Sequence, residues 1–286
     1  MDTILRVATF NLKSSLLGIG IRNWKYRREL IFRMFRELDA DIAGVQELTP
    51  RMRADFLSEL GEYNFIGLGR GGRLLNEHSD IAVKNRLKIN FSNTFWLSKN
   101  PNRISRLISP MSPLSWIFPR ICTVAEVIIG DRRIRVFNTH LDVTSETARC
   151  IQLKIICRQI SMYQESDPLP TILTGDFNTQ PEARSIKTLL DNGFGYENVR
   201  LSSIIEGDVG GTYHFFHGGS QGRRIDYIFA SEEFMPVGSE IIRSSYDGLY
   251  PSDHYPIIAS LKLKDSPTDD NEVNSIKKSQ TESTKS

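Results

Sequence analysis

Short apolar runs that stop abruptly at polar residues recur along the chain. Each run has the length and the apolar content of a strand buried in a sheet. The runs and their polar residues are 4–10 before Asn11, 40–45 before Gln46 and Glu47, 133–139 before His140 and Asp142, 170–173 before Asp176 and Asn178, 224–229 with Asp226 near its start, and 256–263 after Asp253 and His254. The pattern predicts a sheet protein whose polar side chains gather at strand ends.

Helical periodicity appears between several of these runs. Residues 24–38 carry Ile31, Met34, Phe35 and Leu38 at the i, i+3, i+4, i+7 spacing of a core-facing stripe. Further helices are expected at residues 50–60 and 145–162, and from Pro181 to before Gly193 with Ala183, Ile186, Leu189 and Leu190 facing inward. Strands and helices are therefore both expected throughout the chain.

Residues 90–120 show neither the pattern of a strand nor that of a helix and are the least predictable segment. They are rich in aromatic residues and prolines, and we expect an irregular, packed surface loop. An insertion that contacts a substrate or touches a membrane is the alternative. Further strands are expected at residues 80–84 and 121–129.

Length and composition fit a globular chain. The sequence has 286 residues, of which 40% are hydrophobic and 24% charged, enough for one large domain or two small ones. No internal repeat or second domain is visible, so we expect residues 1–264 to form one domain. Residues 265–286 hold five acids and three lysines and lack aromatic residues, and we expect this polar tail to be disordered.

The charge balance neither establishes nor excludes a nucleic-acid partner, because the formal net charge is only +2. Six cations lie within or just before the helix expected at residues 24–38, and a solvated helix face explains them. A phosphate-facing patch is the sharper alternative. These cations are Arg22, Lys25, Arg27, Arg28, Arg33 and Arg36.

Cysteine usage and the N-terminal sequence fit a cytoplasmic protein. Cys122, Cys150 and Cys157 are odd in number and lack metal-site spacing, as expected of reduced thiols. No charged leader followed by a long apolar stretch opens the sequence, and no apolar run is long enough to span a membrane. A cytoplasmic monomer is the expectation.

Two further motifs are weak. Residues 67–72 match G-x-G-x-x-G by letter, but a strand follows and no helix opens, so a dinucleotide site is not expected there. His78, close behind, reads as a loop histidine. The short spacing of His214 and His217 suits a metal, but the flanking glycines indicate no regular helix, and a metal site is the less favoured interpretation.

The polar strand ends suggest a common site. Capping or solvation explains any one of them, but all six together are hard to explain in that way. The set is rich in carboxylate, amide and imidazole, with no thiolate and no Ser–His–Asp pattern. Oxygen-rich ligands favour Mg²⁺ or Mn²⁺ over zinc. The residues therefore suggest metal-assisted phosphoryl chemistry with water as the nucleophile.

Six short motifs carry a family resemblance across residues 4–263. They are Thr9-Phe10-Asn11, Gln46-Glu47, Asn138-Thr139-His140-Leu141, Gly175-Asp176-Phe177-Asn178, Arg224-Ile225-Asp226-Tyr227 and Ser252-Asp253-His254. In this order they resemble the endonuclease/exonuclease/phosphatase superfamily, which includes deoxyribonuclease I, exonuclease III and neutral sphingomyelinases. The resemblance implies a four-layer α/β sandwich, with two packed mixed β-sheets flanked by helices and the site at one edge.

The resemblance also implies residue roles. Glu47 looks like the principal metal ligand, helped by Asn11 and Asp253. Asp176 resembles the residue that orients or deprotonates the attacking water, and Asn178 looks like the amide that holds a phosphate oxygen or that water.

The histidines complete the implied machinery. His254 resembles the imidazole that stabilises the transition state, with Asp226 as its carboxylate partner. His140 matches the histidine that contacts phosphate or protonates the leaving group. The resemblance is weaker for Asp142, Arg149 and Thr212, which are expected to contact phosphate or to support the rim of the site.

Three functions follow from this interpretation. The leading one is a Mg²⁺-dependent phosphodiesterase, with Mn²⁺ as a substitute, that acts as a nuclease on DNA, RNA or a nucleotide-like diester. The alternative is a phosphatase or a sphingomyelinase-like phospholipase that acts on a lipid or inositol headgroup. A catalytically silent binding module on the same fold is the third, and the complete set of competent residues disfavours it.

Overall fold

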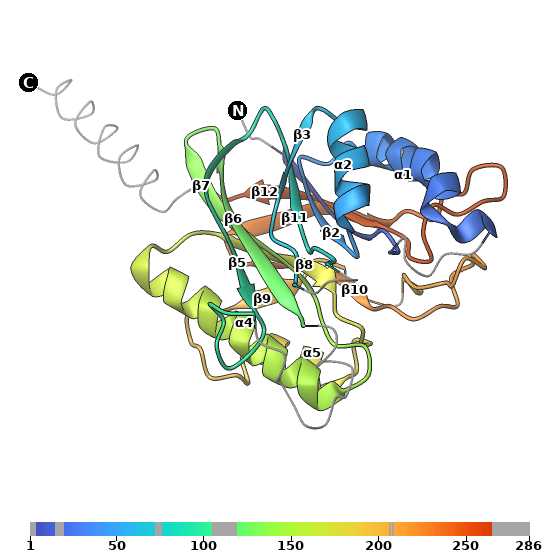
Figure 1. Ribbon diagram of the computed structural model, residues 1–286. Coiled ribbons are helices and arrows are strands. Elements are labelled where there is room, and N and C mark those ends of the chain that lie inside the picture. The colour runs from blue at the N-terminus through green and yellow to red at the C-terminus, as the bar shows by residue number, and fades with distance from the viewer. Residues whose placement is uncertain are drawn as a thin grey trace, which may run out of the picture.

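Two six-stranded β-sheets pack face to face in this computed structural model (Figure 1). The structure describes residues 4–14, 20–71, 76–104, 119–205, 207 and 209–264. Both sheets are mixed, with one parallel pair of strands at the centre of each and antiparallel neighbours around it. Apolar side chains from both sheets meet between them, among them Val7, Ile42, Val136 and Ile172.

The first sheet combines strands from both ends of the described chain. Its spatial order is β11-β12-β1-β2-β4-β3. The strands are β1 Ile4–Asn11, β2 Ile42–Gln46, β3 Tyr63–Ile66, β4 Ile81–Lys84, β11 Phe234–Ile241 and β12 Ile257–Leu263.

The second sheet is formed by one continuous stretch of chain. Its spatial order is β5-β6-β7-β8-β10-β9. The strands are β5 Lys88–Trp96, β6 Ile121–Ile129, β7 Arg132–His140, β8 Thr171–Asp176, β9 Leu201–Ser203 and β10 Asp226–Ser231.

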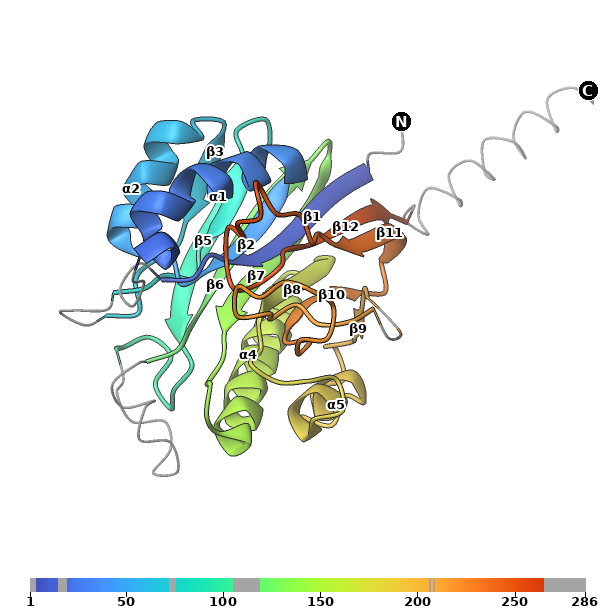
Figure 2. The same ribbon diagram turned by 90° about the vertical axis from the view of Figure 1, so that its right-hand side faces the viewer.

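Helices cover the outer face of each sheet, which gives the four layers seen in Figure 2. Helices α1 (Trp24–Leu38) and α2 (Pro50–Glu59) pack on the first sheet, and α4 (Glu146–Ser166) and α5 (Arg184–Leu190) pack on the second. A short 3₁₀ turn, η1 (Gly20–Arg22), precedes α1. Side-chain caps set the helix starts: Asn23 accepts from the Lys25 N–H, and Ser145 from the Ala148 N–H. The expected sandwich is confirmed.

Strand direction brings the predicted polar residues to one edge. The parallel strands β1, β2, β7 and β8 all end there. The antiparallel strands β10 and β12 begin there, since Asp226 pairs with Asp176 and Ile257 with Thr9.

A buried polar layer joins the sheets just below this edge. Asn138 Nδ2 donates to the carbonyls of Val45 (2.9 Å) and Asp80 (2.8 Å) in the facing sheet. Asn138 Oδ1 accepts from Gln46 Nε2 at 2.7 Å. The sheets approach so closely here that a Cβ on Gly44 would lie 2.5 Å from Asn138 Oδ1. This layer fixes the spacing between the two halves of the edge.

Several sequence expectations were wrong. Residues 90–96 belong to strand β5, so part of the segment expected to be irregular is regular. Helix α5 begins at Arg184, three residues after Pro181, and the side chain of Leu190 is 42% exposed. Strands β9 and β11 were not predicted. Residues 105–118 and the polar tail 265–286 lie outside the described residues.

Candidate active site

Asn11 connects the two halves of the edge. Its Nδ2 donates to Glu47 Oε1 at 3.2 Å and to Asp176 Oδ2 at 2.9 Å. Glu47 directly follows β2 of the first sheet and Asp176 ends β8 of the second, so one buried amide holds together carboxylates delivered by both sheets. Ser252 Oγ in turn donates to the Asn11 carbonyl at 2.7 Å, which ties the loop before β12 to the same point.

Glu47 lies directly after β2 in a left-handed conformation, with φ of 57°. The Ser14 N–H donates to its Oε2 at 2.7 Å. Burial alone would raise the pKa of Glu47, but the Lys13 ammonium and the Ser14 N–H outweigh burial and hold this pKa below its usual value. Glu47 is therefore a carboxylate at neutral pH.

Lys13 indicates that this part of the edge favours a cation. Its Nζ lies 3.4 Å from Asp253 Oδ2, and the carboxylates of Glu47 and Asp253 raise the pKa of Lys13 although burial opposes them. The side chains of Glu47 and Asp253 thus act together on one positive charge.

Asp226 and His254 form a buried pair. His254 Nδ1 lies 2.9 Å from Asp226 Oδ2. Burial would lower the pKa of His254, but the carboxylates of Asp226 and Asp176 outweigh it and raise the pKa to about 10. His254 is therefore an imidazolium at neutral pH, and its Nε2 faces Asp176 Oδ2 at 3.9 Å.

Asp176 is the most perturbed acid of the site. Burial and the nearby Asp226 carboxylate raise the pKa of Asp176 to about 7. The Asn178 N–H donates to Asp176 Oδ1 at 2.9 Å. Asp176 Oδ2 accepts from Asn11 Nδ2 and lies 3.6 Å from His140 Nε2. A carboxyl that titrates near neutrality is suited to accept a proton from water.

His140 and Asn178 flank this carboxyl. Burial, together with the positive charges of Arg120 and Arg70, lowers the pKa of His140 well below its usual value, so His140 is neutral. Asn178 has φ of 53°, and its side-chain Nδ2 donates to the Leu141 carbonyl at 3.1 Å.

Two groups of side chains compete as metal ligands. The donor atoms of Asp176, Asp226 and His254 lie within 4.8 Å of one another. His254 is a poor ligand, because it is protonated and its Nδ1 is committed to Asp226. Glu47 with Asp253 fits a hard divalent cation better, since these oxygens already stabilise the Lys13 ammonium.

Three predicted substrate-contact residues have mainly local partners. Asp142 Oδ1 accepts from the backbone N–H groups of Thr144 and Ser145, at 2.9 and 2.8 Å. Arg149 Nη1 donates to the Asp142 carbonyl at 2.8 Å. Thr212 Oγ1 accepts from the Ile225 N–H at 3.1 Å. These contacts support the rim of the site.

Two other sequence motifs, His214 with His217 and the cations of α1, have structural roles in packing and at the surface. His214 Nδ1 accepts from the Gly218 N–H at 3.1 Å, and its ring stacks on Tyr255 at 3.8 Å. On α1, Arg33 pairs with Glu37, and Arg28 and Arg36 also have acidic partners. The basic face of α1 is therefore largely neutralised.

Three cations near the site, Lys13, Arg70 and Arg120, were not predicted as functional, and Arg27 was named only within the basic segment around residues 24–38. Lys13 lies after the end of β1 with φ of 57°, so the strand pattern does not point to it. Arg70 and Arg120 carry no local signal either, because chain reversals that no local pattern encodes bring them to the edge.

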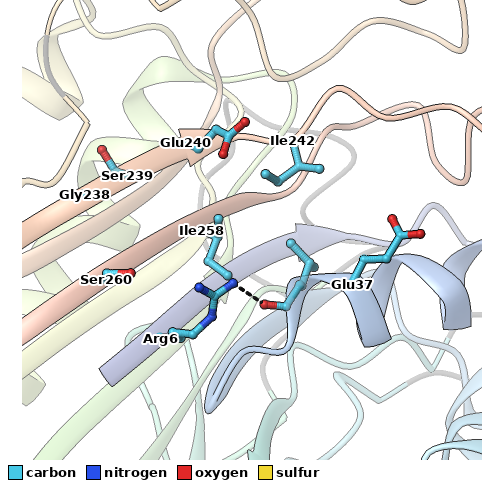
Figure 3. A pocket seen from close by; sticks show the side chains of 9 residues that line it. Arg6, Glu37, Gly238, Ser239, Glu240, Ile242, Ile258 and Ser260 are labelled. Carbon is cyan, nitrogen blue, oxygen red and sulfur yellow. Dashed lines mark hydrogen bonds between the residues drawn. The ribbon is translucent and has the colours of Figure 1, made fainter. Parts of the chain in front are cut away.

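A groove of about 510 Å³ lies elsewhere, between α1 and strands β11 and β12 (Figure 3). Arg6 lines it and donates to the Leu38 carbonyl at 2.8 Å. Arg6 lies five residues before Asn11 on β1, roughly 17 Å along the strand. This groove is therefore separate from the polar edge.

Comparisons with known proteins agree with the fold. Residues 8–254 match the model of the Endonuclease/Exonuclease/phosphatase family. A search of curated proteins finds no match. A family protein from Bacteroides thetaiotaomicron is 26% identical with a TM-score of 0.81, over 93% of this chain and 100% of that chain.

Two more solved structures are similar. A mannosyl-6-phosphatase from Bacteroides thetaiotaomicron is 27% identical with a TM-score of 0.80, over 90% of this chain and 99% of that one. The catalytic domain of human Nocturnin is 18% identical with a TM-score of 0.71, over 92% of this chain and 97% of that one, and shows the shared fold alone. Among the described residues, no helix is long and apolar enough to cross a membrane.

Proposed function

Because the chain belongs to the endonuclease/exonuclease/phosphatase family, we propose that it is a divalent-metal-dependent phosphoester hydrolase in which water attacks phosphorus. The observation that carries this proposal is the arrangement around Asp176 Oδ2. Asn11 Nδ2 lies at 2.9 Å, His140 Nε2 at 3.6 Å and His254 Nε2 at 3.9 Å from this oxygen. A carboxyl group and two imidazoles thus meet at one point of the edge.

Asp176 accepts the proton of the attacking water. Its pKa of about 7 matches a base that works near neutral pH. The hydrogen bonds from Asn11 and Asn178 fix the orientation of the carboxylate, so it is poised without rearrangement.

His254 and His140 supply hydrogen-bond donors to the phosphoryl oxygens and the leaving group. Asp226 holds the His254 imidazolium by Nδ1, which leaves the positively charged Nε2–H for an oxygen that gains negative charge. His140 is neutral and donates without adding charge. Such donors are worth about 10²–10³-fold each when they act on the transition state.

Glu47, Asp253 and Asn11 would hold the metal, with Mg²⁺ as the leading ion and Mn²⁺ as its substitute. When bound, the metal supplies positive charge to the phosphoryl oxygens.

For the substrate, we favour a phosphomonoester of a compact molecule such as a sugar. The similar mannosyl-6-phosphatase acts on that class. The net charge is only +2, and Arg33 and Arg36 on α1 are ion-paired, so these charges give more support to a small substrate than to a polyanion. This revises the nuclease favoured by the sequence.

A nuclease or nucleotide diesterase is the second candidate, because aromatic rings lie beside His254. Tyr213 packs edge-on against the His254 ring at 5.0 Å, and Phe215 follows at 6.2 Å from Tyr213. Phe215 is 48% exposed, and the Arg22 guanidinium lies 5.2 Å from its ring. Exposed rings with nearby cations suit the stacking of bases.

The test is hydrolysis with and without Mg²⁺ or Mn²⁺, with Asp176→Asn as the blank and Asp191→Asn as the matched control on an exposed acid. The panel holds p-nitrophenyl phosphate, mannose 6-phosphate, bis-p-nitrophenyl phosphate, single-stranded DNA, RNA and an inositol polyphosphate. Metal-dependent monoester cleavage that is lost in Asp176→Asn supports the proposal. Cleavage of nucleic acid alone selects the second candidate. No turnover of any ester would favour the silent binding module.

A further inference from the structure

A small cavity adjoins the catalytic edge on the side of Glu47 and His140. Its walls include two arginines, Arg70 and Arg120, together with Glu77. The cavity has room for about one water molecule. Neither arginine has a part in the chemistry described above.

Arg120 carries one buried donor atom for which the described residues supply no acceptor. The residue is only 9% exposed, and its Nε is buried without a hydrogen-bond partner among the described residues. A buried donor of a charged group that lacks a partner destabilises the folded protein. An anion in the cavity would remove this cost.

Arg70 is held firmly beside the cavity. Its Nη2 pairs with Glu77 Oε2 at 2.9 Å, and its backbone carbonyl accepts from Trp96 Nε1 at 2.9 Å. Glu77 pairs with Arg70, and Glu47, which also lines the cavity, would be engaged by the metal. The positive charges of Arg120 and Arg70 reach the reacting residues, because both help to lower the pKa of His140.

We propose that Arg70 and Arg120 bind a terminal oxygen of a phosphomonoester, so that the enzyme selects monoesters over diesters. The inference rests on the proposed function. A monoester carries nearly two negative charges at neutral pH and a diester one, so two guanidinium groups favour the monoester. The cavity accommodates an oxygen atom but not the second organic group of a diester.

The test compares Arg120→Met with the parent enzyme on p-nitrophenyl phosphate and bis-p-nitrophenyl phosphate, both with metal. Loss of one charge-assisted hydrogen bond is expected to lower kcat/KM for the monoester about 10- to 100-fold, mostly through KM. The diester value should change less than about threefold. Inorganic phosphate should inhibit the variant about tenfold more weakly than the parent.

Arg133→Met is the matched control, because Arg133 lies at the other end of β7 from His140. Arg120→Lys keeps the positive charge but lacks the guanidinium group, which can donate two parallel hydrogen bonds. It also serves as the second variant if Arg120→Met does not fold. Intermediate losses in Arg120→Lys support the proposal. Equal losses on both esters, or unchanged phosphate inhibition in a folded variant, would overturn it. Because the parent enzyme would still be active, that outcome leaves the proposed function standing.

Discussion

His254 Nδ1 lies 2.9 Å from Asp226 Oδ2, in a pair that is closed to solvent and joins the two sheets. The carboxylate does two things for the imidazole: it fixes the ring orientation and it keeps the ring protonated against the cost of burial.

Asp226→Asn should therefore lower kcat about 10²–10⁴-fold. Without the carboxylate charge, burial lowers the pKa of His254, and the positive Nε2–H is lost near neutral pH. Substrate affinity should change little. Steady-state kinetics at saturating metal check this, with the melting temperature as a folding control. A folded Asp226→Asn with near-parental kcat would remove His254 from the chemistry.

Asp176→Asn should gain stability relative to the parent as the pH rises. The folded pKa of Asp176, about 7, lies above the ordinary value of 3.8. Below pH 4 the Asp176 carboxyl is protonated in both the folded and the unfolded protein. Above pH 7 the folded protein must bury the negative charge of this carboxylate. Between these limits, the difference in unfolding free energy should grow by up to about 1.4 kcal/mol per pH unit.

Urea unfolding in the presence of a chelator, at pH 5 and pH 8, measures this difference. A stability difference that is the same at both pH values would show that Asp176 is not perturbed. The expected sign also means that the site sacrifices stability for function.

Arg27→Met should destabilise the protein by about 3 kcal/mol. Arg27 is buried and donates to four backbone carbonyls: Leu12 at 2.9 Å, Lys13 at 2.7 Å, Arg22 at 2.8 Å and Pro251 at 2.6 Å. It ties together the loops that carry Lys13 and Asp253, so activity should fall as well. Chemical denaturation gives the free energy of unfolding.

Arg28→Met is the matched control for that experiment. Arg28 is the next residue along, and its side chain is 46% exposed. Its loss should cost less than about 0.5 kcal/mol. Equal effects of the two substitutions would contradict the assigned role of Arg27.

Gly44→Ala should destabilise the chain by about 2 kcal/mol or more, because the sheets cannot separate freely. The added Cβ would lie 2.2 Å from Thr174 Oγ1 and 2.5 Å from Asn138 Oδ1. Gly61→Ala, where no atom lies within 4 Å of the added Cβ, is the control. Thermal unfolding compares the melting temperatures of the two variants. A Gly44→Ala variant as stable as Gly61→Ala would show that the polar layer can move.

The sequence predicted that the polar residues at the strand ends would lie together, because parallel strands deliver their last residues to a common edge, and the structure places them side by side. Asn11, Glu47 and Asp176 were predictable in this way. Strand β11 was missed because it is an edge strand with Pro236 and Gly238 and six of its eight residues exposed, so no alternating pattern appears. Arg120 was missed because only the packing of β6 against its neighbours reveals that its guanidinium is buried.

The first sheet is completed by the last strands of the described chain, while the second sheet is one uninterrupted segment. During synthesis, the segment through β10 contains Asp176, Asp226 and His140 but lacks His254, which arrives just before β12. A nascent or truncated polypeptide that stops before residue 250 therefore lacks the imidazolium and Asp253. Hydrolytic activity should appear only after β11 and β12 have paired with each other and β12 with β1. Turnover would then report complete folding.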